Sequence, residues 1–351
     1  MAIIHKINLN NYRNFKNYEV SFENNNVIYG LNGSGKTNIL ESISLLGKGR
    51  GFRNSSIEDL ILNNKENFLV ECLLENKNLK HEVKIFNKKN ENKQKKISSI
   101  DDEISKEATN YLQNTITFLY FLPEMERLFV ASPTYRRNFI DKLIFSENKN
   151  YNKLINKYKK NVSERSKILQ LLDYDINWIS TIEKEIALTG LEIYRLRSKQ
   201  LDILNNELND LNKLNDYSFD IKFIKQDKFY KVHMKIEEYL NYLIKSRNID
   251  KHSGGTKIGP HKSDFIAEIN NSINASQLST GQQKTLVLMT LFAQCRYLII
   301  KHKIKPILLF DEICSHLDNI NRKILLDLTK QFNIQFFFTG TEKSFFSFMS
   351  T

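Results

Sequence analysis

One glycine-rich octapeptide near the start of the chain constrains the fold more than any other feature. Residues Gly30–Thr37 read G-L-N-G-S-G-K-T and fit the pattern G-x4-G-K-[S/T]. The apolar run Val27–Tyr29 precedes the motif, and apolar residues at helical spacing follow it between Ile39 and Leu46. A glycine loop between a strand and a helix is the setting of a phosphate-binding P-loop. The sequence therefore predicts an α/β domain that binds a nucleotide.

This loop supplies several kinds of contact to a nucleotide. Its glycines let backbone N–H groups wrap the phosphates, and the following helix adds the partial positive charge of its N-terminus. Lys36, a predicted catalytic residue, is expected to reach the β- and γ-phosphates of ATP, and the Thr37 hydroxyl to bind Mg²⁺. A glycine-rich turn without a ligand is the alternative, which the flanking elements disfavour. The predicted nucleotide-binding residues here are Gly30, Asn32, Gly33, Ser34, Gly35, Lys36, Thr37 and Asn38.

Two carboxylates follow an apolar strand far along the chain. Ile307–Phe310 is uninterruptedly apolar and leads into Asp311 and Glu312. We expect Asp311 to hold Mg²⁺ together with Thr37, and the second predicted catalytic residue, Glu312, to orient or deprotonate the attacking water. A buried strand ending in a solvated acidic turn is the alternative. It loses weight because a segment H-L-D follows directly, and its last residue, Asp318, joins the predicted nucleotide-binding residues.

A third segment, Leu278–Lys284, reads L-S-T-G-Q-Q-K and opens a long apolar stretch. A serine before a helix is ordinary N-terminal capping when it stands alone. Between a P-loop and an Asp-Glu strand, however, the segment resembles the LSGGQ signature of ABC-type ATPases. That resemblance implies that Ser279, Gly281 and Gln282 contact the γ-phosphate of ATP bound by a second copy of the chain. The expected assembly is an ATP-dependent homodimer.

The character of the chain changes near residue 110. From Ser132-Pro133 to about Leu214 glycine appears once, and apolar residues recur at helical spacing. Four leucines in this stretch step by three and four, which predicts a packed helical seam. They are Leu201, Leu204, Leu208 and Leu211. We expect a compact antiparallel helical arm over residues 112–214, inserted into an ATPase head made of residues 1–111 and 215–351.

Outside the arm, apolar patterns predict short strands and two further helices. The later strands are expected at residues 217–224, 265–269, 306–310 and 334–338, and the helices at 230–247 and 282–300. The run Lys88–Lys96 is rich in lysine and asparagine and is interpreted as a solvated hairpin loop. A charge run alone is weak evidence for contact with DNA.

Composition bounds the partners and the compartment. The net charge of +12 and the pI of about 9.3 favour a polyanionic partner such as DNA. Three isolated cysteines, Cys72, Cys295 and Cys314, indicate neither a zinc site nor a disulfide framework. The N-terminus lacks the apolar stretch of a signal peptide, and no run is long enough for a membrane helix. We expect a soluble cytoplasmic protein without a membrane partner.

Several further segments resemble the RecF family of bacterial DNA-repair proteins, in family order over nearly the whole chain. They are Asn11–Phe15, Gly35–Glu41, Gly49–Arg53, Pro123-Glu124, Ser132–Asp141, Gly259–Asp264 and Leu278–Lys284. The chain departs from the family pattern at Met125, at Ala131 and at Lys262, where the family usually has aspartate, glycine and arginine. Lysine keeps the charge of arginine but loses its bidentate geometry.

The resemblance implies an α/β fold: an ABC-type, SMC-like P-loop ATPase head with an inserted α-helical arm domain. It also implies weak, DNA-stimulated ATP hydrolysis, dimerisation on single-stranded or gapped DNA, and a role in DNA repair and replication. RecO and RecR are the implied partners in loading RecA at single-strand gaps coated by SSB. Thr339-Gly340-Thr341 lies where a residue sensing the γ-phosphate is expected, without the histidine usual in transporter ATPases.

Three alternatives remain. An ABC transporter subunit would need a membrane partner and would lack the arm. A scaffold could use ATP only to hold its dimer together, although Glu312 argues against this. An SMC-like head that assists a nuclease is disfavoured because no long coiled coil and no metal cluster are evident. Loose candidates for DNA contact are Arg136, Arg137, Lys159 and Lys160, each more simply a solvated surface charge.

Overall fold

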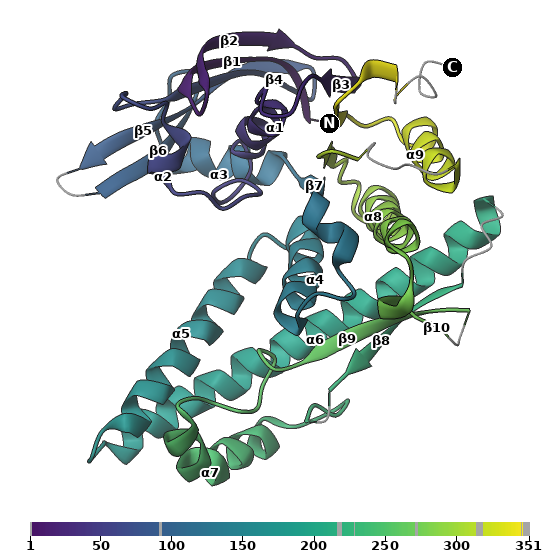
Figure 1. Ribbon diagram of the computed structural model, residues 1–351. Coiled ribbons are helices and arrows are strands. Elements are labelled where there is room, and N and C mark those ends of the chain that lie inside the picture. Colours follow the sequence, from purple (N-terminus) through teal and green to yellow (C-terminus); the bar gives the residue numbers. More distant parts are fainter. Residues whose placement is uncertain are drawn as a thin grey trace. The chain divides into compact units, whose positions relative to one another are not determined.

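The computed structural model divides into two compact units (Figure 1). The first unit is Met1–Glu126 with Ser279–Thr351, and the second is Arg127–Leu278. The first unit therefore contains both ends of the chain. The residues described are 2–90, 93–215, 220–227, 229–270, 273–313, 319–344 and 346.

A four-stranded sheet in the first unit carries the segments that follow β3 and β11. Its order is β3 (Asn25–Tyr29), β12 (Phe336–Gly340), β11 (Ile307–Phe310) and β7 (Phe118–Phe121). Every neighbouring pair is parallel, and the register aligns Phe310 with Phe338 and Gly340 with Tyr29. Because all four strands run the same way, the loops after β3, β11 and β12 emerge at one edge of the sheet, where ligands bind in α/β folds.

The other sheet of this unit is antiparallel, in the order β2-β1-β4-β5-β6. Its strands are β1 (Ala2–Tyr12), β2 (Phe15–Ser21), β4 (Leu69–Asn76), β5 (Leu79–Asn90) and β6 (Lys93–Ile100). The loop predicted over Lys88–Lys96 is wrong, because the ladder of β5 and β6 continues to the pair Asn90 and Lys93. Buried Asn87 explains the error: its side chain accepts from the Phe68 N–H and donates to the Glu66 carbonyl, so a polar residue occupies an inward position.

Five α-helices are described in this unit. They are α1 (Lys36–Ser44), α2 (Ile57–Leu60), α3 (Lys106–Thr115), α8 (Thr280–His302) and α9 (Asn319–Gln331). The predicted helix at 282–300 lies within α8, which is buried along most of its length. Ser279 caps its first turn, and Lys303 ends it in the left-handed conformation with φ 58°.

In the second unit, helices pack with a small antiparallel sheet (Figure 1). The elements are α4 (Pro133–Glu147), α5 (Tyr151–Gln170), α6 (Ile176–Asn215), β8 (Ile221–Gln226), α7 (Ile236–Ser253), β9 (Asp264–Ile269) and β10 (Ile273–Asn274). All four leucines of the predicted seam are buried on α6. The helix predicted at 230–247 is displaced toward the C-terminus. Asp227 accepts from the N–H groups of Phe229 and Tyr230, which makes a turn there.

Residues 215–278 differ from the predicted domain division. They were assigned to the head, but the contacts of the chain group them with the helices of the second unit. The physical reason is pairing and packing between distant segments: β8 pairs with β9, α6 packs on β8, and α7 packs on α5 and α6. Such contacts have no local signature in the sequence.

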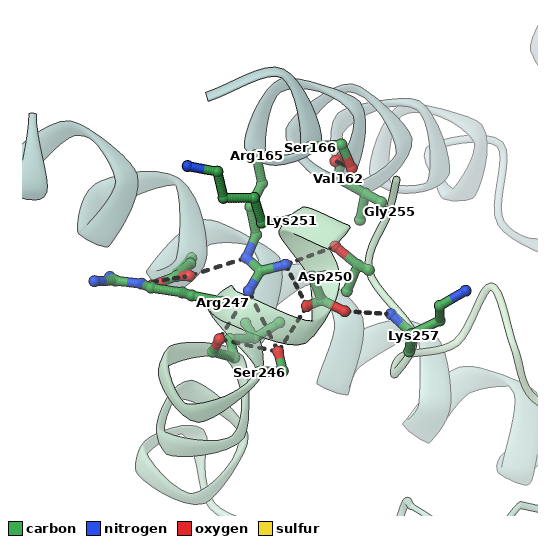
Figure 2. A network of polar contacts seen from close by, with 12 residues as sticks. Val162, Arg165, Ser166, Ser246, Arg247, Asp250, Lys251, Gly255 and Lys257 are labelled. Atoms are coloured by element: carbon green, nitrogen blue, oxygen red, sulfur yellow. Dashed lines mark hydrogen bonds and ion pairs between the residues drawn. The ribbon is translucent and has the colours of Figure 1, made fainter. Parts of the chain in front are cut away.

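A buried ion-pair network fastens α5, α6 and α7 together (Figure 2). The Arg165 guanidinium donates to Glu183 at 2.9 Å and to Asp250 and the Leu243 carbonyl at 2.7 Å. Arg247 donates to the other oxygen of Glu183 at 2.6 Å. Arg165 and Glu183 are fully buried, so each charge depends on its partners rather than on water.

Across the described part of the chain, none of the helices combines the length and the apolar character that a membrane span requires.

Candidate nucleotide site

The P-loop lies between β3 and α1, as its flanking sequence predicts. Gly35 is the N-cap of α1 and has φ 99°, a left-handed conformation that favours glycine. A Cβ atom at this position would lie 2.5 Å from Phe15 Cζ and 2.7 Å from Asn14 Nδ2. The turn between β1 and β2 therefore covers the loop so closely that only glycine fits.

Lys36 points its ammonium group back into the loop. Its Nζ donates to the Gly30 carbonyl at 2.8 Å and to the Leu31 carbonyl at 3.0 Å, and the residue is 5% exposed. Residues 31–34 are exposed, so the backbone of the loop faces solvent while the cation lies inside it. A positive charge within a ring of backbone groups at a helix N-terminus suits a phosphate.

Asp311 is the centre of a short chain of hydrogen bonds that joins α1, β12 and the residues after β11. Its Oδ1 accepts from Thr37 Oγ1 at 2.9 Å and from Thr339 Oγ1 at 2.8 Å. The Thr339 hydroxyl in turn accepts from the Glu312 N–H at 2.8 Å. Glu312 has φ 49°, so this hydrogen bond holds a backbone conformation that is uncommon for glutamate. The chain joins three of the predicted site residues through Thr339.

The environment of Asp311 suits a hard cation. Burial raises the pKa of its carboxyl group, and the hydrogen bonds from Thr339 and Thr37 oppose that rise. Among the described residues, both side-chain hydrogen bonds to this carboxylate end on Oδ1. A carboxylate and a hydroxyl oxygen are ligands that Mg²⁺ accepts, usually beside waters and phosphate oxygens. Thr37 and Asp311 therefore fit the metal-binding roles predicted for them.

Behind the loop, three segments that were noted for their resemblance meet on one buried carboxylate. Glu41 of α1 accepts from Arg13 Nε and Nη2, each at 2.8 Å, and from Ser55 Oγ at 2.7 Å. Arg53 lies 3.6 Å from the same carboxylate and donates to Asn38 Oδ1 at 2.9 Å. These contacts hold α1 in place through Glu41, and α1 begins with Lys36 and Thr37.

The segment around Ser279 is exposed to solvent, as the P-loop is. The Ser279 side chain accepts from the Gln282 N–H at 3.3 Å, and its N–H donates to Gln282 Oε1 at 3.0 Å, which is a capping box. Ser279 and Gln282 remain exposed. Lys284 is buried, and its Nζ forms an ion pair with Glu126 Oε1 at 2.8 Å. Within one copy of the chain the segment is thus a rigid helix start that presents its N-terminus to solvent.

The remaining predicted residues fall into two groups. Asp318 and Cys314 lie outside the described residues. Gly30, Asn32, Gly33, Ser34 and Asn38 belong to the loop or to the start of α1 as predicted. Thr339 was noted only as part of the segment where a residue sensing the γ-phosphate is expected. It lies within β12, and its contact with Asp311 joins residues 28 positions apart, which the sequence alone does not predict.

Two of the loose candidates for DNA contact have structural roles instead. Arg136 forms a bidentate pair with Asp264 at 2.9 and 2.6 Å and also donates to two backbone carbonyls. Arg137 donates to the Ser263 carbonyl at 2.7 Å, and burial lowers its pKa. Lys159 and Lys160 remain exposed on α5. The two arginines therefore tie α4 to the start of β9.

Fold and site together define an ABC-type ATPase head: a P-loop, an Asp-Glu pair after a parallel strand and a capped signature-like helix. The family model described as "RecF/RecN/SMC N terminal domain" matches residues 3–351. The DNA replication and repair protein RecF of Rickettsia massiliae is 35% identical over 342 residues, covering 96% of this chain and 94% of that protein. The same protein of Rickettsia prowazekii is 35% identical over 343 residues, covering 97% and 94%. The chain belongs to the RecF family.

Solved structures agree with this assignment. A structure described as "the recombination mediator protein RecF-ATPrS in RecFOR pathway" superimposes with a TM-score of 0.84 and 28% identity, covering 98% of this chain and 94% of that one. The Smc head domain of Pyrococcus furiosus, bound to part of ScpA, gives a TM-score of 0.53 with 18% identity, covering 99% and 92%. The second likeness supports the fold alone.

Proposed function

We propose that the protein is an ATP-dependent, DNA-binding recombination mediator that dimerises with ATP and hydrolyses it slowly. The observation that carries the proposal is the hydrogen-bonded chain from Thr37 through Asp311 and Thr339 to Glu312 beside the P-loop. It supports Thr37 and Asp311 as the metal-binding pair and Glu312 as the base, because these residues meet at the carboxyl ends of the strands of one parallel sheet. The family membership adds DNA repair and replication as the biological setting.

In this proposal, each residue of the loop has a defined task. Backbone N–H groups of Gly30–Thr37 bind the phosphates of ATP, and Lys36 exchanges its two carbonyl partners for phosphate oxygens. Thr37 and Asp311 would hold Mg²⁺, which would neutralise part of the phosphate charge when bound. Asn38 stays fixed by Asn14 and Arg53, so the start of α1 does not have to reorganise.

Hydrolysis is phosphoryl transfer to water. Glu312 accepts a proton from the attacking water, or orients it, while Lys36 stabilises the charge on the phosphates. Thr339 holds the Glu312 backbone through the 2.8 Å hydrogen bond from its N–H. Catalysis then rests on positioning and electrostatics rather than on covalent chemistry by the protein.

The proposed dimer brings together two exposed parts of the protein, the P-loop of one copy and the start of α8 at Ser279 of the other. Ser279, Gly281 and Gln282 of one copy close on the γ-phosphate held by the P-loop of the other, and Asp318 remains a predicted nucleotide-binding residue. The exposed helix N-terminus at Ser279, once its capping box with Gln282 is exchanged for a phosphate, is a suitable anion site. Loss of the γ-phosphate on hydrolysis removes the charge that bridges the copies, so the dimer opens and releases DNA.

The setting of this activity is gapped or single-stranded DNA, in the cytoplasm. A related solved structure is described as RecF with ATP in the RecFOR pathway, which supports RecO and RecR as partners. RecA as the protein loaded follows from the family resemblance alone. Two other functions use the same site: an SMC-like head that assists a nuclease, and a scaffold that dimerises on ATP without meaningful turnover. The rate of ATP hydrolysis on gapped DNA separates the scaffold from the mediator.

Light scattering tests the dimer directly. The wild type, with ATP-Mg²⁺, ADP or no nucleotide, with and without a gapped duplex, is expected to dimerise only with ATP and more tightly on DNA. Ser279→Arg should bind ATP but remain a monomer, because the larger cation blocks the second phosphate contact. Ser21→Arg, the same change at an exposed edge-strand position, should dimerise normally. A monomeric wild type with ATP, or a dimeric Ser279→Arg, contradicts the proposal.

A further inference from the structure

The β5–β6 hairpin extends past the sheet that carries it. Strand β4 pairs with β5 only as far as Leu69 and Phe86. Beyond that point β5 and β6 pair with each other alone, from Asn87 and Lys96 to Asn90 and Lys93. Figure 1 shows this two-stranded ribbon projecting from the rest of its unit. We call residues 87–90 and 93–96 the lysine ribbon.

The charge of the lysine ribbon is one-sided. Residues 87–96 contain five lysines and one glutamate. Lys88 and Lys95 lie directly opposite each other in the ladder, and both are exposed. Neither forms an ion pair with any residue whose side chain is described. Like charges opposite each other on neighbouring strands destabilise a sheet, so the register holds together two groups that repel.

The two faces of the ribbon have different tasks, because side chains alternate along a strand. On one face, Lys96 donates to the Leu45 and Gly49 carbonyls at 2.9 and 2.7 Å, and burial lowers its pKa to about 8. Leu45 is the C-cap of α1, so this contact fastens the base of the ribbon to the P-loop helix. The opposite face carries Lys88 and Lys95 into solvent.

We propose that the outer face of the lysine ribbon binds the phosphate backbone of duplex DNA. A fixed pair of repelling cations is stabilised when a polyanion replaces water and mobile counterions. A two-stranded ribbon is also narrow enough to lie along or within a groove of the duplex. The inference rests on the proposed function of a DNA-binding protein, and it locates part of the contact on the first unit, on the hairpin that Lys96 joins to the C-terminal end of α1. Because the contact is to phosphates, it is independent of base sequence.

A simpler role for these lysines is protection of an open strand edge against pairing with other chains. The two roles differ in their dependence on salt. Each phosphate contact that is lost lowers the slope of log K against log salt concentration by about 0.9 for duplex DNA. Edge protection contributes nothing to that slope.

The test compares two double variants that lose the same charge. Lys88→Gln/Lys95→Gln removes the repelling pair. Lys77→Gln/Lys80→Gln removes two exposed lysines at the opposite end of β5, one in the turn between β4 and β5 and one at the start of β5. Anisotropy of a labelled duplex, titrated with each protein at several NaCl concentrations, gives the slopes. We expect the first variant to lower the slope by about 2 and the control to leave it unchanged. Lys88→Arg/Lys95→Arg should restore the wild-type slope.

Equal slopes for the two Gln variants would overturn the ribbon inference while the proposed function stands, provided that the wild type binds DNA. A wild type that binds gapped DNA but not fully paired duplex at low salt would also overturn the ribbon inference, and one that binds neither would overturn the proposed function itself. Binding of a fluorescent ATP analogue by each variant shows that the head is folded.

Discussion

Two buried clusters of charge, one in each unit, differ in how their charges are matched. In the second unit Arg165 meets Glu183 and Asp250, and Arg247 meets Glu183, so cations are paired directly with carboxylates. In the first unit the carboxylate of Asp311 receives hydroxyl donors, and the ammonium of Lys36 donates to carbonyls. Both clusters are nearly excluded from water.

This difference separates a structural cluster from a binding site. A guanidinium between two carboxylates has no remaining need of a partner, and adding a ligand would displace bonds already made. The buried carboxylate of Asp311 and the buried ammonium of Lys36 are bonded to neutral groups, and each can gain a charged partner. Thr37, which donates to Asp311, directly follows Lys36 in the chain. A nucleotide phosphate with a divalent cation offers both charges at once.

The largest expected effect comes from breaking the matched cluster. Arg165→Met should lower the free energy of unfolding by about 3–5 kcal/mol, because Glu183 and Asp250 lose the cation that compensates their burial. Urea denaturation followed by circular dichroism measures it. Arg195→Met is the control. It breaks the exposed ion pair between Arg195 and Glu192, both on α6, and should lower the free energy of unfolding by at most about 1 kcal/mol. A loss for Arg165→Met no larger than for the control contradicts the comparison.

The unmatched cluster should respond in rate rather than in stability. Thr339→Val keeps the shape of the side chain but removes both the donor to Asp311 and the acceptor for the Glu312 N–H. Hydrogen bonds to charged groups contribute about 1.5–3 kcal/mol, so kcat for ATP hydrolysis should fall roughly 10- to 100-fold. The Kd for ATP should change by less than about threefold.

Thr339→Ser separates this positioning role from packing. Serine retains the hydroxyl and should recover most of kcat, although it loses a buried methyl group. If Ser is as slow as Val, packing rather than hydrogen bonding explains the loss. If Val hydrolyses ATP at the wild-type rate, Thr339 has no part in positioning Glu312.

A third prediction concerns Gly259 in the second unit, where neighbouring side chains leave no room for a Cβ atom. Gly259 has φ +127°, and a Cβ there would lie 2.3 Å from Tyr158 Oη and 2.5 Å from Tyr239 Oη. Gly259→Ala should lower the free energy of unfolding by about 1–3 kcal/mol through backbone strain and overpacking. Gly255→Ala, whose Cβ would meet only Ser166 Oγ at 3.9 Å, should be nearly neutral. Equal urea midpoints for the two variants would contradict this reading of the crowded site.

How much of the fold and of the candidate site could be predicted depends on how far apart in the sequence the contacting residues lie. A local pattern at the end of an apolar strand can be recognised in the sequence. The P-loop, Asp311 and Glu312 are patterns of this kind. The roles of Thr339 and of Glu41 with Arg13 depend on side chains that meet only after the parallel sheet and the β1–β2 turn have formed. The same holds for residues 215–278, whose place in the second unit is fixed by strand pairing between β8 and β9.

Polar residues in inward positions caused the remaining errors. Alternation of apolar and polar residues is the main signal for a strand, and it fails where a buried polar side chain satisfies itself by hydrogen bonding. Asn87 does this in β5, and so the ribbon looked like a loop. Arg136 and Arg137 show the converse case, since basic residues that look like a surface for DNA are used to hold α4 to β9.

The smallest expected effect is a dependence of stability on pH at His261, which follows Gly259-Pro260. Its Nδ1 lies 2.7 Å from Tyr158 Oη and its Nε2 lies 2.8 Å from the Thr256 carbonyl. A ring that donates from Nε2 and accepts at Nδ1 satisfies both contacts while neutral. Burial lowers the pKa of His261, and the nearby cations Lys262, Arg137 and Arg197 lower it further.

Because the folded state holds this proton less tightly than the unfolded chain, acidification favours unfolding. The stability linked to neutral His261 is complete above the unfolded pKa of about 6.5 and declines as the pH falls below it. His261→Gln keeps a donor and an acceptor but cannot take the charge. Urea midpoints at pH 7.5 and 5.5 should therefore fall further for the wild type than for His261→Gln. An equal fall in both proteins would mean that other groups titrate on unfolding and that the Tyr158–His261 contact tolerates the imidazolium. In that case the second unit would contain a polar cluster that, unlike the one around Arg165, accommodates a change of charge.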